Sequence, residues 1–177
     1  MTVITRTPEN TNFLQPTKFL LTFSRIPDVT YFCQEANVPG ISLQGISVPS
    51  PMLDYHVAGN KLTYNQFSIR FMVDEKLQSW KNIHDWFRSL ASPTGFQERN
   101  TLTRMQNQYN DSKLISYSDA TLTILTNLNN PVARINLHDL FPISLSDIQF
   151  DTTLSADNII TADATFIVEY FDIEELD

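Results

Sequence analysis

Residues that build metal, redox and phosphate sites are scarce in this sequence. The single cysteine, Cys33, excludes an internal disulfide and any site with several cysteine ligands. The three histidines form no His-x-x-x-His or His-Glu-x-x-His pattern, so a metal site has no support. Only four glycines are present, and no glycine-rich phosphate-binding loop occurs. We therefore expect neither a metal nor a cofactor.

Patterns of nucleophilic and acid–base catalysis are also missing. No Gly-x-Ser-x-Gly elbow occurs, and Cys33 lies in an apolar, aromatic segment where a thiol is more often core than nucleophile. Asp147 and Asp151 could serve as the paired carboxylates of a glycosidase, but acidic residues are so common in this sequence that the pair is weak evidence. We predict that the chain is not an enzyme.

Long hydrophobic runs are absent. No run approaches the ~18 apolar residues that a membrane span needs, and residues 1–8 lack the apolar stretch of a secretory signal. The 177 residues are 42% hydrophobic and 18% charged, which favours one folded domain over residues 1–177.

The net charge of −8 comes almost entirely from the second half. Residues 1–100 hold nine Lys or Arg and eight Asp or Glu, whereas residues 101–177 hold three and twelve. Phosphate affinity comes mainly from Lys and Arg, so specific nucleic-acid binding is disfavoured. The simplest interpretation of the acidic half is a solvated surface.

Most of the chain has the patterns of β-strands. Residues 17–24 and 29–36 flank a turn-prone Ile26-Pro27-Asp28 and suggest a hairpin. The alternation in 62–73 is the clearest strand pattern. Further strands are expected at 41–49, 114–117, 120–126, 132–138, 143–150 and 160–171, followed by a frayed acidic tail at 172–177.

One helix is expected over about 75–91, with Asp74 as its N-cap. Apolar residues recur there at spacings of three and four and predict the buried stripe Leu77, Trp80, Ile83, Phe87 and Leu90. Two extended loops are expected, at about 50–61 after the Pro49/Pro51 break and at about 92–112. The fold class is α+β and mainly β: an antiparallel β-sandwich or partial barrel with one packed helix.

Four segments together resemble the tail tube protein family of contractile-tailed bacteriophages. They are residues 12–19 (NFLQPTKF) leading into LLTF, residues 33–40 (CQEANVPG), the run from 56–61 (HVAGNK) through Asp74-Glu75 to Asp85-Trp86, and Leu140-Phe141-Pro142 with residues 166–171 (FIVEYF). Their order across about residues 12–172 matches the family, whereas residues 92–118 do not.

The resemblance implies a structural subunit of a phage contractile tail tube, assembled in the host cytoplasm and located in the virion. Such subunits form homo-hexameric rings that stack, and DNA passes through the lumen during ejection without specific binding. The implied partners are the chain itself and the tail sheath, tape-measure and baseplate proteins, with no membrane or small-molecule substrate. A tube-initiator ring at the baseplate or a tube-terminal ring of the same family is the alternative. A β-sandwich binding module is more remote, and a baseplate hydrolase lacks a catalytic constellation.

Two sets of residues are candidates for function in such a ring. Exposed apolar residues in the 50–61 segment predict an inter-ring contact by Met52, Leu53, Tyr55 and His56. An acidic lumen would repel DNA instead of binding it, so Asp147, Asp151, Asp163 and Glu169 are candidates for lining it.

Overall fold

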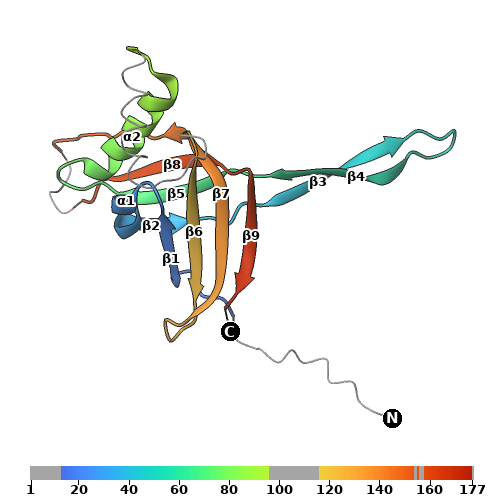
Figure 1. Ribbon diagram of the computed structural model, residues 1–177, viewed down its shortest axis with the longest axis horizontal. Coiled ribbons are helices and arrows are strands. Elements are labelled where there is room, and N and C mark those ends of the chain that lie inside the picture. The colour runs from blue at the N-terminus through green and yellow to red at the C-terminus, as the bar shows by residue number, and fades with distance from the viewer. Residues whose placement is uncertain (1–12, 96–115, 154, 156–157, 177) are drawn as a thin grey trace, which may run out of the picture.

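Two antiparallel sheets that share one strand form the body of the protein in the computed structural model (Figure 1). The structure describes residues 13–95, 116–153, 155 and 158–176. The elements in chain order are β1 (Phe19–Phe23), α1 (Pro27–Phe32), β2 (Cys33–Ala36), β3 (Ile41–Val48), β4 (Tyr55–Tyr64), β5 (Phe67–Met72), α2 (Gln78–Ala91), β6 (Ser118–Leu125), β7 (Pro131–Leu145), β8 (Thr161–Ile167) and β9 (Tyr170–Glu175).

Strand β7 joins the two sheets. Its first part pairs with β6 and β9, and its last part pairs with β8. The sheet therefore has the order β1-β6-β7-β8-β5-β2, with β9 added beside β7. Asp139 adopts φ 54°, a left-handed conformation that Asp tolerates better than most residues, and its amide donates to the Asp119 carboxylate over 3.1 Å. This bend allows β7 to pass from one half of the sheet to the other.

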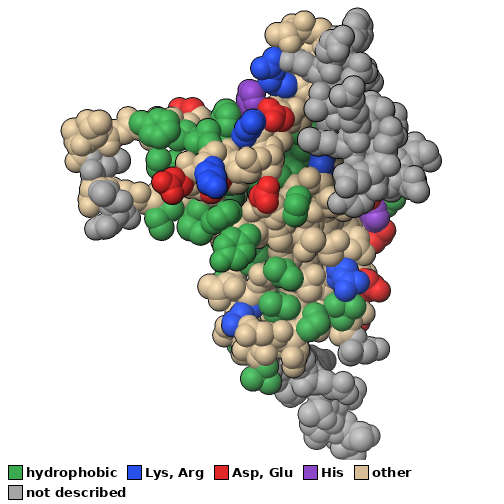
Figure 2. Space-filling model, turned by 60° about the vertical axis from the view of Figure 1, so that its left-hand side comes forward, with side chains coloured by type: hydrophobic (Ala, Val, Ile, Leu, Met, Phe, Trp, Pro, Cys, Tyr) green, Lys and Arg blue, Asp and Glu red, His purple; other side chains and the backbone are tan. Residues whose placement is uncertain are grey.

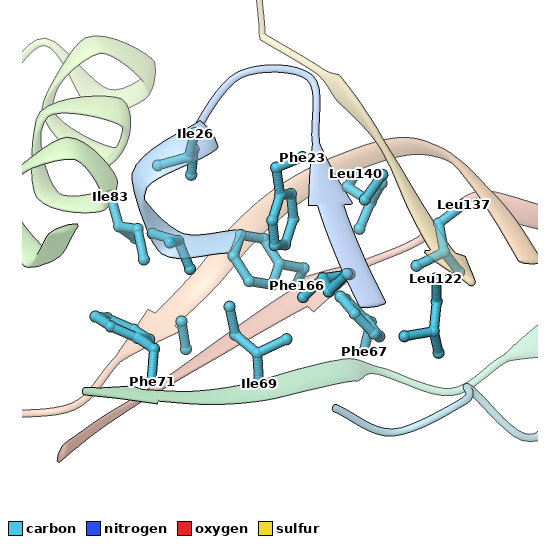
Figure 3. Packing of buried hydrophobic residues seen from close by; sticks show 14 of the residues in the cluster. Phe23, Ile26, Phe67, Ile69, Phe71, Ile83, Leu122, Leu137, Leu140 and Phe166 are labelled. Carbon is cyan, nitrogen blue, oxygen red and sulfur yellow. The ribbon is translucent and has the colours of Figure 1, made fainter. Parts of the chain in front are cut away.

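The core lies between the two halves, and aromatic rings fill its centre. Strand β5 alternates buried and exposed residues, so Phe67, Ile69 and Phe71 point inward. The ring of Phe166 on β8 lies 5.5 Å from that of Phe23 on β1 and 6.2 Å from that of Phe67 (Figure 3). These cross-sheet contacts hold β1 against strands that lie far away in sequence. The fold class, mainly β with antiparallel sheets, is confirmed.

Helix α2 closes the core at the end of the molecule opposite the β3–β4 hairpin (Figure 1). Asp74 was predicted as the N-cap, but the N-cap residue is Leu77. Asp74, three residues earlier, still binds the first turn: the Ser79 amide donates to its carboxylate over 2.8 Å and the Ser79 hydroxyl over 2.6 Å. Leu77 takes a left-handed conformation, so the helix begins at Gln78 and not at residue 75. No helix in the described part of the chain is long and apolar enough to cross a membrane.

The predicted buried stripe of this helix was partly wrong. Ile83 is fully buried, but the deeply buried tryptophan is Trp86, which donates from Nε1 to the Ser116 carbonyl over 3.2 Å. Trp80 is half-buried and donates to the Ser146 carbonyl instead. Leu77 is also half-buried. The buried face of the helix therefore consists of Ser79, Ile83, Trp86 and Ser89.

The predicted hairpin of residues 17–24 and 29–36 was wrong. Strand β1 pairs with β6, and β2 pairs with β5. Pro27 does not sit in a turn but begins α1, where its fixed φ suits the first helical position and its missing N–H costs nothing. The buried side chain of Val29 holds this short helix on the core.

Four other predicted boundaries also differ from the structure. The strand expected at 62–73 is divided between the end of β4 and β5. The strands expected at 132–138 and 143–150 are one strand that ends at Leu145, with Pro142 tolerated beside a register shift. The strand expected at 160–171 is divided into β8 and β9. The tail is not frayed through 172–175, because these residues pair with β7. Residues 96–112 of the second predicted loop, and residues 114–115 of the strand expected at 114–117, lie outside the described residues.

Candidate assembly surface

Strands β3 and β4 form a two-stranded ribbon that projects from the body (Figure 1). Apolar residues pair across the ribbon at four positions: Ile41 with Tyr64, Leu43 with Leu62, Ile46 with Val57, and Val48 with Tyr55. Most of these side chains are exposed. Polar pairs such as Ser47–His56 alternate with them. The ribbon thus has the pattern of a half-buried sheet without a covering layer.

A partner molecule that covers the apolar side chains of the ribbon would explain why a strand pattern typical of a half-buried sheet is exposed here. A two-stranded hairpin is only marginally stable alone in water, and contiguous exposed apolar residues usually mark an interaction site. The predicted contact residues lie at the far end of the ribbon. Met52 and Leu53 are 98% and 75% exposed in the tip, and Tyr55 and His56 begin β4. The segment expected as a loop at 50–61 is therefore a turn followed by the first part of a strand.

A bulge interrupts the ribbon halfway along. The register shifts between Leu43 and Gly45, where one β3 residue faces three residues of β4. A Cβ at Gly59 would collide with the carbonyl oxygen of Gln44, whereas a Cβ at Gly45 would meet the Val57 carbonyl at an ordinary 3.8 Å. Gly59 is therefore required by the close approach of the two backbones. The sequence interpretation missed this residue, although an isolated glycine within a strand pattern is a known indication of a bulge.

Polar contacts anchor the base of the ribbon to the body. The Asn37 side chain donates to the Gln66 carbonyl over 3.1 Å and accepts from the Ser68 amide over 2.6 Å. The Asn65 amide donates to the Gly40 carbonyl over 2.8 Å. These bonds join the connections that lead into and out of the ribbon, so its direction relative to β5 is fixed. Asn37 was not predicted, because its role depends on a partner 31 positions away.

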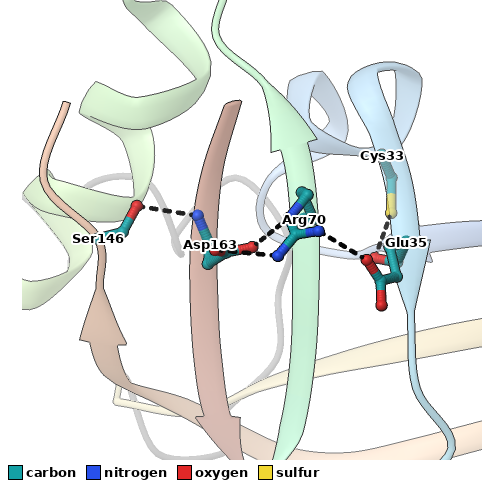
Figure 4. Close-up of polar contacts among 5 residues, drawn as sticks. All are labelled: Cys33, Glu35, Arg70, Ser146 and Asp163. Atoms are coloured by element: carbon teal, nitrogen blue, oxygen red, sulfur yellow. Dashed lines mark hydrogen bonds and ion pairs between the residues drawn. The ribbon is translucent and has the colours of Figure 1, made fainter. Parts of the chain in front are cut away.

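A row of polar groups crosses the exposed face of the sheet formed by β2, β5, β8 and the last part of β7 (Figure 4). Arg70 on β5 donates from Nε to Asp163 on β8 over 2.8 Å and from Nη1 to Glu35 on β2 over 3.1 Å. The Asp163 amide donates to the Ser146 hydroxyl over 2.9 Å. The adjacent carboxylates raise the pKa of the Arg70 guanidinium, Asp163 most of all. Arg70 thus offsets much of the negative charge of this row.

The four acids predicted to line a lumen lie on different elements. Asp163 is bound to Arg70, and Glu169 lies in the bend between β8 and β9. Asp147 and Asp151 lie on the connection between β7 and β8, where the Thr153 hydroxyl donates to the Asp151 carboxylate over 2.7 Å and lowers its pKa. The structure brings none of these four carboxylates into hydrogen-bonding contact with another within the described residues.

Cys33 fits the role of a structural residue. Its side chain is half-buried against the core, and its thiol donates to the Glu35 carbonyl over 3.4 Å. Burial raises the pKa of this thiol to about 11, so it is protonated at neutral pH and a poor nucleophile. Among the described residues, no three His, Cys, Asp or Glu side chains converge as metal ligands would.

Exposed apolar side chains are not confined to the ribbon. Figure 2 shows hydrophobic side chains on a second face of the molecule, interspersed with acidic and basic ones. Tyr31 on α1, Phe150 after β7 and Leu128 in the turn between β6 and β7 are each more than three-quarters exposed. Single exposed apolar residues of this kind are common on protein surfaces, so the ribbon, where they are paired along two strands, is the stronger indication of an interaction site.

Comparison with known proteins identifies the family. The family model of the phage tail tube protein matches residues 6–174 of the chain. The chain belongs to this family. The resemblance found in the sequence motifs is therefore confirmed, and the ribbon, the shared-strand sheets and the helix are those of a tail tube protein family member.

Individual relatives include tube-terminating proteins. The chain is 25% identical over 150 residues to the tail tube terminator protein of Enterobacteria phage T4, covering 82% of the chain and 78% of the relative. Its fold is similar to that of the tube terminating cap of the anti-feeding prophage, with a TM-score of 0.65 and 13% identity over 99% of this chain and 100% of that one. It is also similar to a chain in the sheath/tube terminator structure of the PVC extracellular contractile injection system, with a TM-score of 0.58 and 13% identity over 93% and 99% of the two chains.

Proposed function

We propose that this protein is the terminator ring of a contractile tail tube. In this role, copies of the chain form a homo-hexameric ring that docks on the last ring of the tube and ends its growth. The role is structural and non-catalytic, in the virion tail, and the remaining neighbours are sheath proteins. The β3–β4 ribbon is the observation that carries the proposal, because it pairs apolar residues as a covered sheet does, and six of the eight paired side chains are exposed.

The ribbon docks on the tube ring through its tip. Met52 and Leu53 project furthest into solvent, and Tyr55 and His56 follow at the start of β4. Burial of exposed apolar area stabilises such a contact by about 25 cal/mol per Å² before the costs of association. The hydrogen bonds of Asn37 hold the ribbon in position before contact, which reduces the entropy lost on docking.

Similarity to the terminator of phage T4 favours a terminal ring over a main tube subunit or a baseplate initiator. A tube subunit must offer docking surfaces at both ends of its ring, because rings stack indefinitely. A terminator ring must offer one such surface to the tube and none to a second terminator ring. The expected outcome for the isolated protein is therefore single rings and no long tubes.

An acidic lumen remains a proposal. Asp147, Asp151 and Glu169 retain exposed carboxylates, whereas Asp163 contributes less free charge than expected because Arg70 binds it. DNA that passes such a ring would meet weak repulsion within about 8–10 Å of the wall at physiological salt. Contacts of this ring with tape-measure and baseplate proteins are predictions that rest on the family resemblance.

The proposal is tested by changing the tip and measuring binding to tube ends. The double substitution Met52→Ser and Leu53→Ser removes two exposed side chains and should leave the thermal unfolding of the body unchanged. We expect binding to tubes of the cognate tube protein to weaken by at least about tenfold, which corresponds to 1.4 kcal/mol. Leu128→Ser is the matched control, because Leu128 is 81% exposed in a turn that is not part of the ribbon. Equal binding by the tip variant and the wild type would refute docking through the tip.

A further inference from the structure

We propose that the thioether of Met52, at the tip of the ribbon, is a reversible oxidation site that controls docking. Oxygen transfer from a peroxide converts this side chain into methionine sulfoxide, which is polar, and the oxidised chain then docks poorly on the tube. This inference rests on the proposed function, because it gives the docking surface of the ribbon a chemical means of regulation.

Met52 is the most exposed of the large hydrophobic side chains in the described part of the chain. Its exposed fraction is 98%, whereas the Met72 side chain on β5 is half-buried. An oxidant must reach the sulfur atom to react with it. A peroxide reaches the Met52 sulfur directly, but it reaches that of Met72 only past neighbouring side chains. Met52 is therefore oxidised first of these two residues.

The tip of the ribbon also lies far from the body. The last cross-strand pair is Val48 with Tyr55, so Met52 lies in the short segment 49–54 that connects the two strands. This segment is at the free end of the ribbon, away from the two sheets of the body (Figure 1). Both a peroxide and a reductase therefore have access to Met52 without any unfolding of the body.

Oxidation adds one oxygen atom to the sulfur and leaves the chain otherwise intact. A sulfur lone pair attacks one oxygen of hydrogen peroxide, the O–O bond breaks and an S–O bond forms, and the other oxygen leaves as water after proton transfer. The sulfur loses two electrons, and the peroxide gains them. Methionine sulfoxide reductases reverse the change. A dithiol supplies the two electrons for this reduction, and the oxygen leaves as water.

The sulfoxide changes the chemistry of the docking surface at the point that projects furthest. The thioether of methionine is apolar and adapts to irregular contacts, whereas the sulfoxide is polar. Burial of its oxygen without a hydrogen-bond donor costs the free energy of the lost hydration. The neighbouring Leu53, itself 75% exposed, is not altered. Oxidation therefore weakens docking without a change in the fold.

Docking in turn protects the site. When the tip is buried against the tube, the Met52 sulfur is shielded from solvent and from reductases. Oxidation thus acts on the free chain and not on a completed tube end. Peroxide applied after docking should oxidise Met52 at least about tenfold more slowly than peroxide applied to the free protein, because access to the sulfur limits the reaction.

Mild peroxide treatment of the full chain tests the site and its effect. Peptide mass spectrometry should show one added oxygen atom at Met52, at least about tenfold faster than at Met72. Binding of the oxidised protein to tubes of the cognate tube protein should weaken by at least about tenfold. Two methionine sulfoxide reductases, one for each epimer, should restore the binding. Thermal unfolding should remain unchanged throughout.

Met52→Leu is the matched control, because leucine keeps an apolar side chain of similar volume and cannot form a sulfoxide. The variant retains Met1, Met72 and Met105, as well as Cys33, so its response to peroxide reports on the remaining sulfur atoms. We expect it to bind tubes equally before and after treatment. A loss after peroxide equal to that of the wild type would place the sensitive site elsewhere and overturn the inference.

Comparison with the Met52→Ser/Leu53→Ser variant separates this inference from the proposed function. Weak binding of the oxidised wild type, restored by the reductases, together with weak binding of the double variant supports both. Full binding of protein that is completely oxidised at Met52, with weak binding of the double variant, overturns the oxidation site and leaves docking through the tip standing. Full binding in both cases overturns both. If Met52→Leu binds weakly before treatment, the reductase step on the wild type decides, and a loss that the reductases do not restore overturns the inference.

Discussion

Gly59 and Gln44 face each other across the bulge of the ribbon so closely that a side chain at position 59 would collide with the Gln44 carbonyl oxygen. The collision is with backbone, so a rotamer change elsewhere cannot relieve it. The direction of the distal half of the ribbon therefore depends on a residue that makes no side-chain contact itself.

We predict that Gly59→Ala impairs assembly much more than folding. The bulge must shift to admit the methyl group, so the tip is displaced and binding to tube ends should fall by at least about tenfold. The ribbon lies outside the core, so the free energy of global unfolding should change by less than about 1 kcal/mol. Denaturant unfolding and tube co-sedimentation measure the two effects. Gly45→Ala is the control, and a similar loss of binding in that variant would argue against a specific role for Gly59.

The two tryptophans of α2 should differ in their contribution to stability. Trp86→Ala removes a buried ring that packs 5.9 Å from Phe166, and should cost about 3–5 kcal/mol, as large aromatic truncations in cores do. Trp80→Ala removes a half-buried ring and should cost about 1–2 kcal/mol. Urea unfolding followed by far-UV circular dichroism gives both values. The reverse order would place the anchor of the helix at Trp80.

The cap of α2 should make stability sensitive to acid. The hydrogen bond from the Ser79 hydroxyl, assisted by backbone amides, lowers the pKa of Asp74 from 3.8 to about 2. Because the folded pKa lies below the unfolded one, the stabilisation is complete above about pH 4 and is lost as the pH falls toward 2. Asp74→Ala should cost about 1 kcal/mol at pH 7 and less at pH 2. Glu75→Ala, which changes an exposed neighbouring acid, is the control in chemical unfolding at both pH values. An equal cost of Asp74→Ala at pH 7 and pH 2 would show that the carboxylate is not the stabilising group.

The spacing of apolar residues along the sequence predicted the elements that bury one face and expose the other. The alternation of β5 and the period of α2 identified both, because each buries one face against the core. The pattern failed where the partner is distant: the Ile26-Pro27-Asp28 segment suits both a hairpin turn and a helix start, and only packing against β6 and the core decides between them. Strand β9 was missed because an edge strand can keep its acids solvated.

The candidate surface was found only in part. Pro49 and Pro51 marked the tip of the ribbon, since neither can donate to a ladder, and this placed Met52 and Leu53 correctly in an exposed segment. Asn37 and Gly59 act through backbone groups of other segments, so no local pattern reveals what they contact.

Elongation of tail tubes in the presence of the purified protein tests the central claim most directly. Tubes of the cognate tube protein are grown with and without this chain, and their lengths and ends are measured by electron microscopy. The account predicts single rings bound at tube ends and elongation that stops as the protein is added, whereas the Met52→Ser/Leu53→Ser variant leaves growth unchanged. Incorporation of the protein along the length of the tubes, or polymerisation of the protein alone into long tubes, would contradict the account.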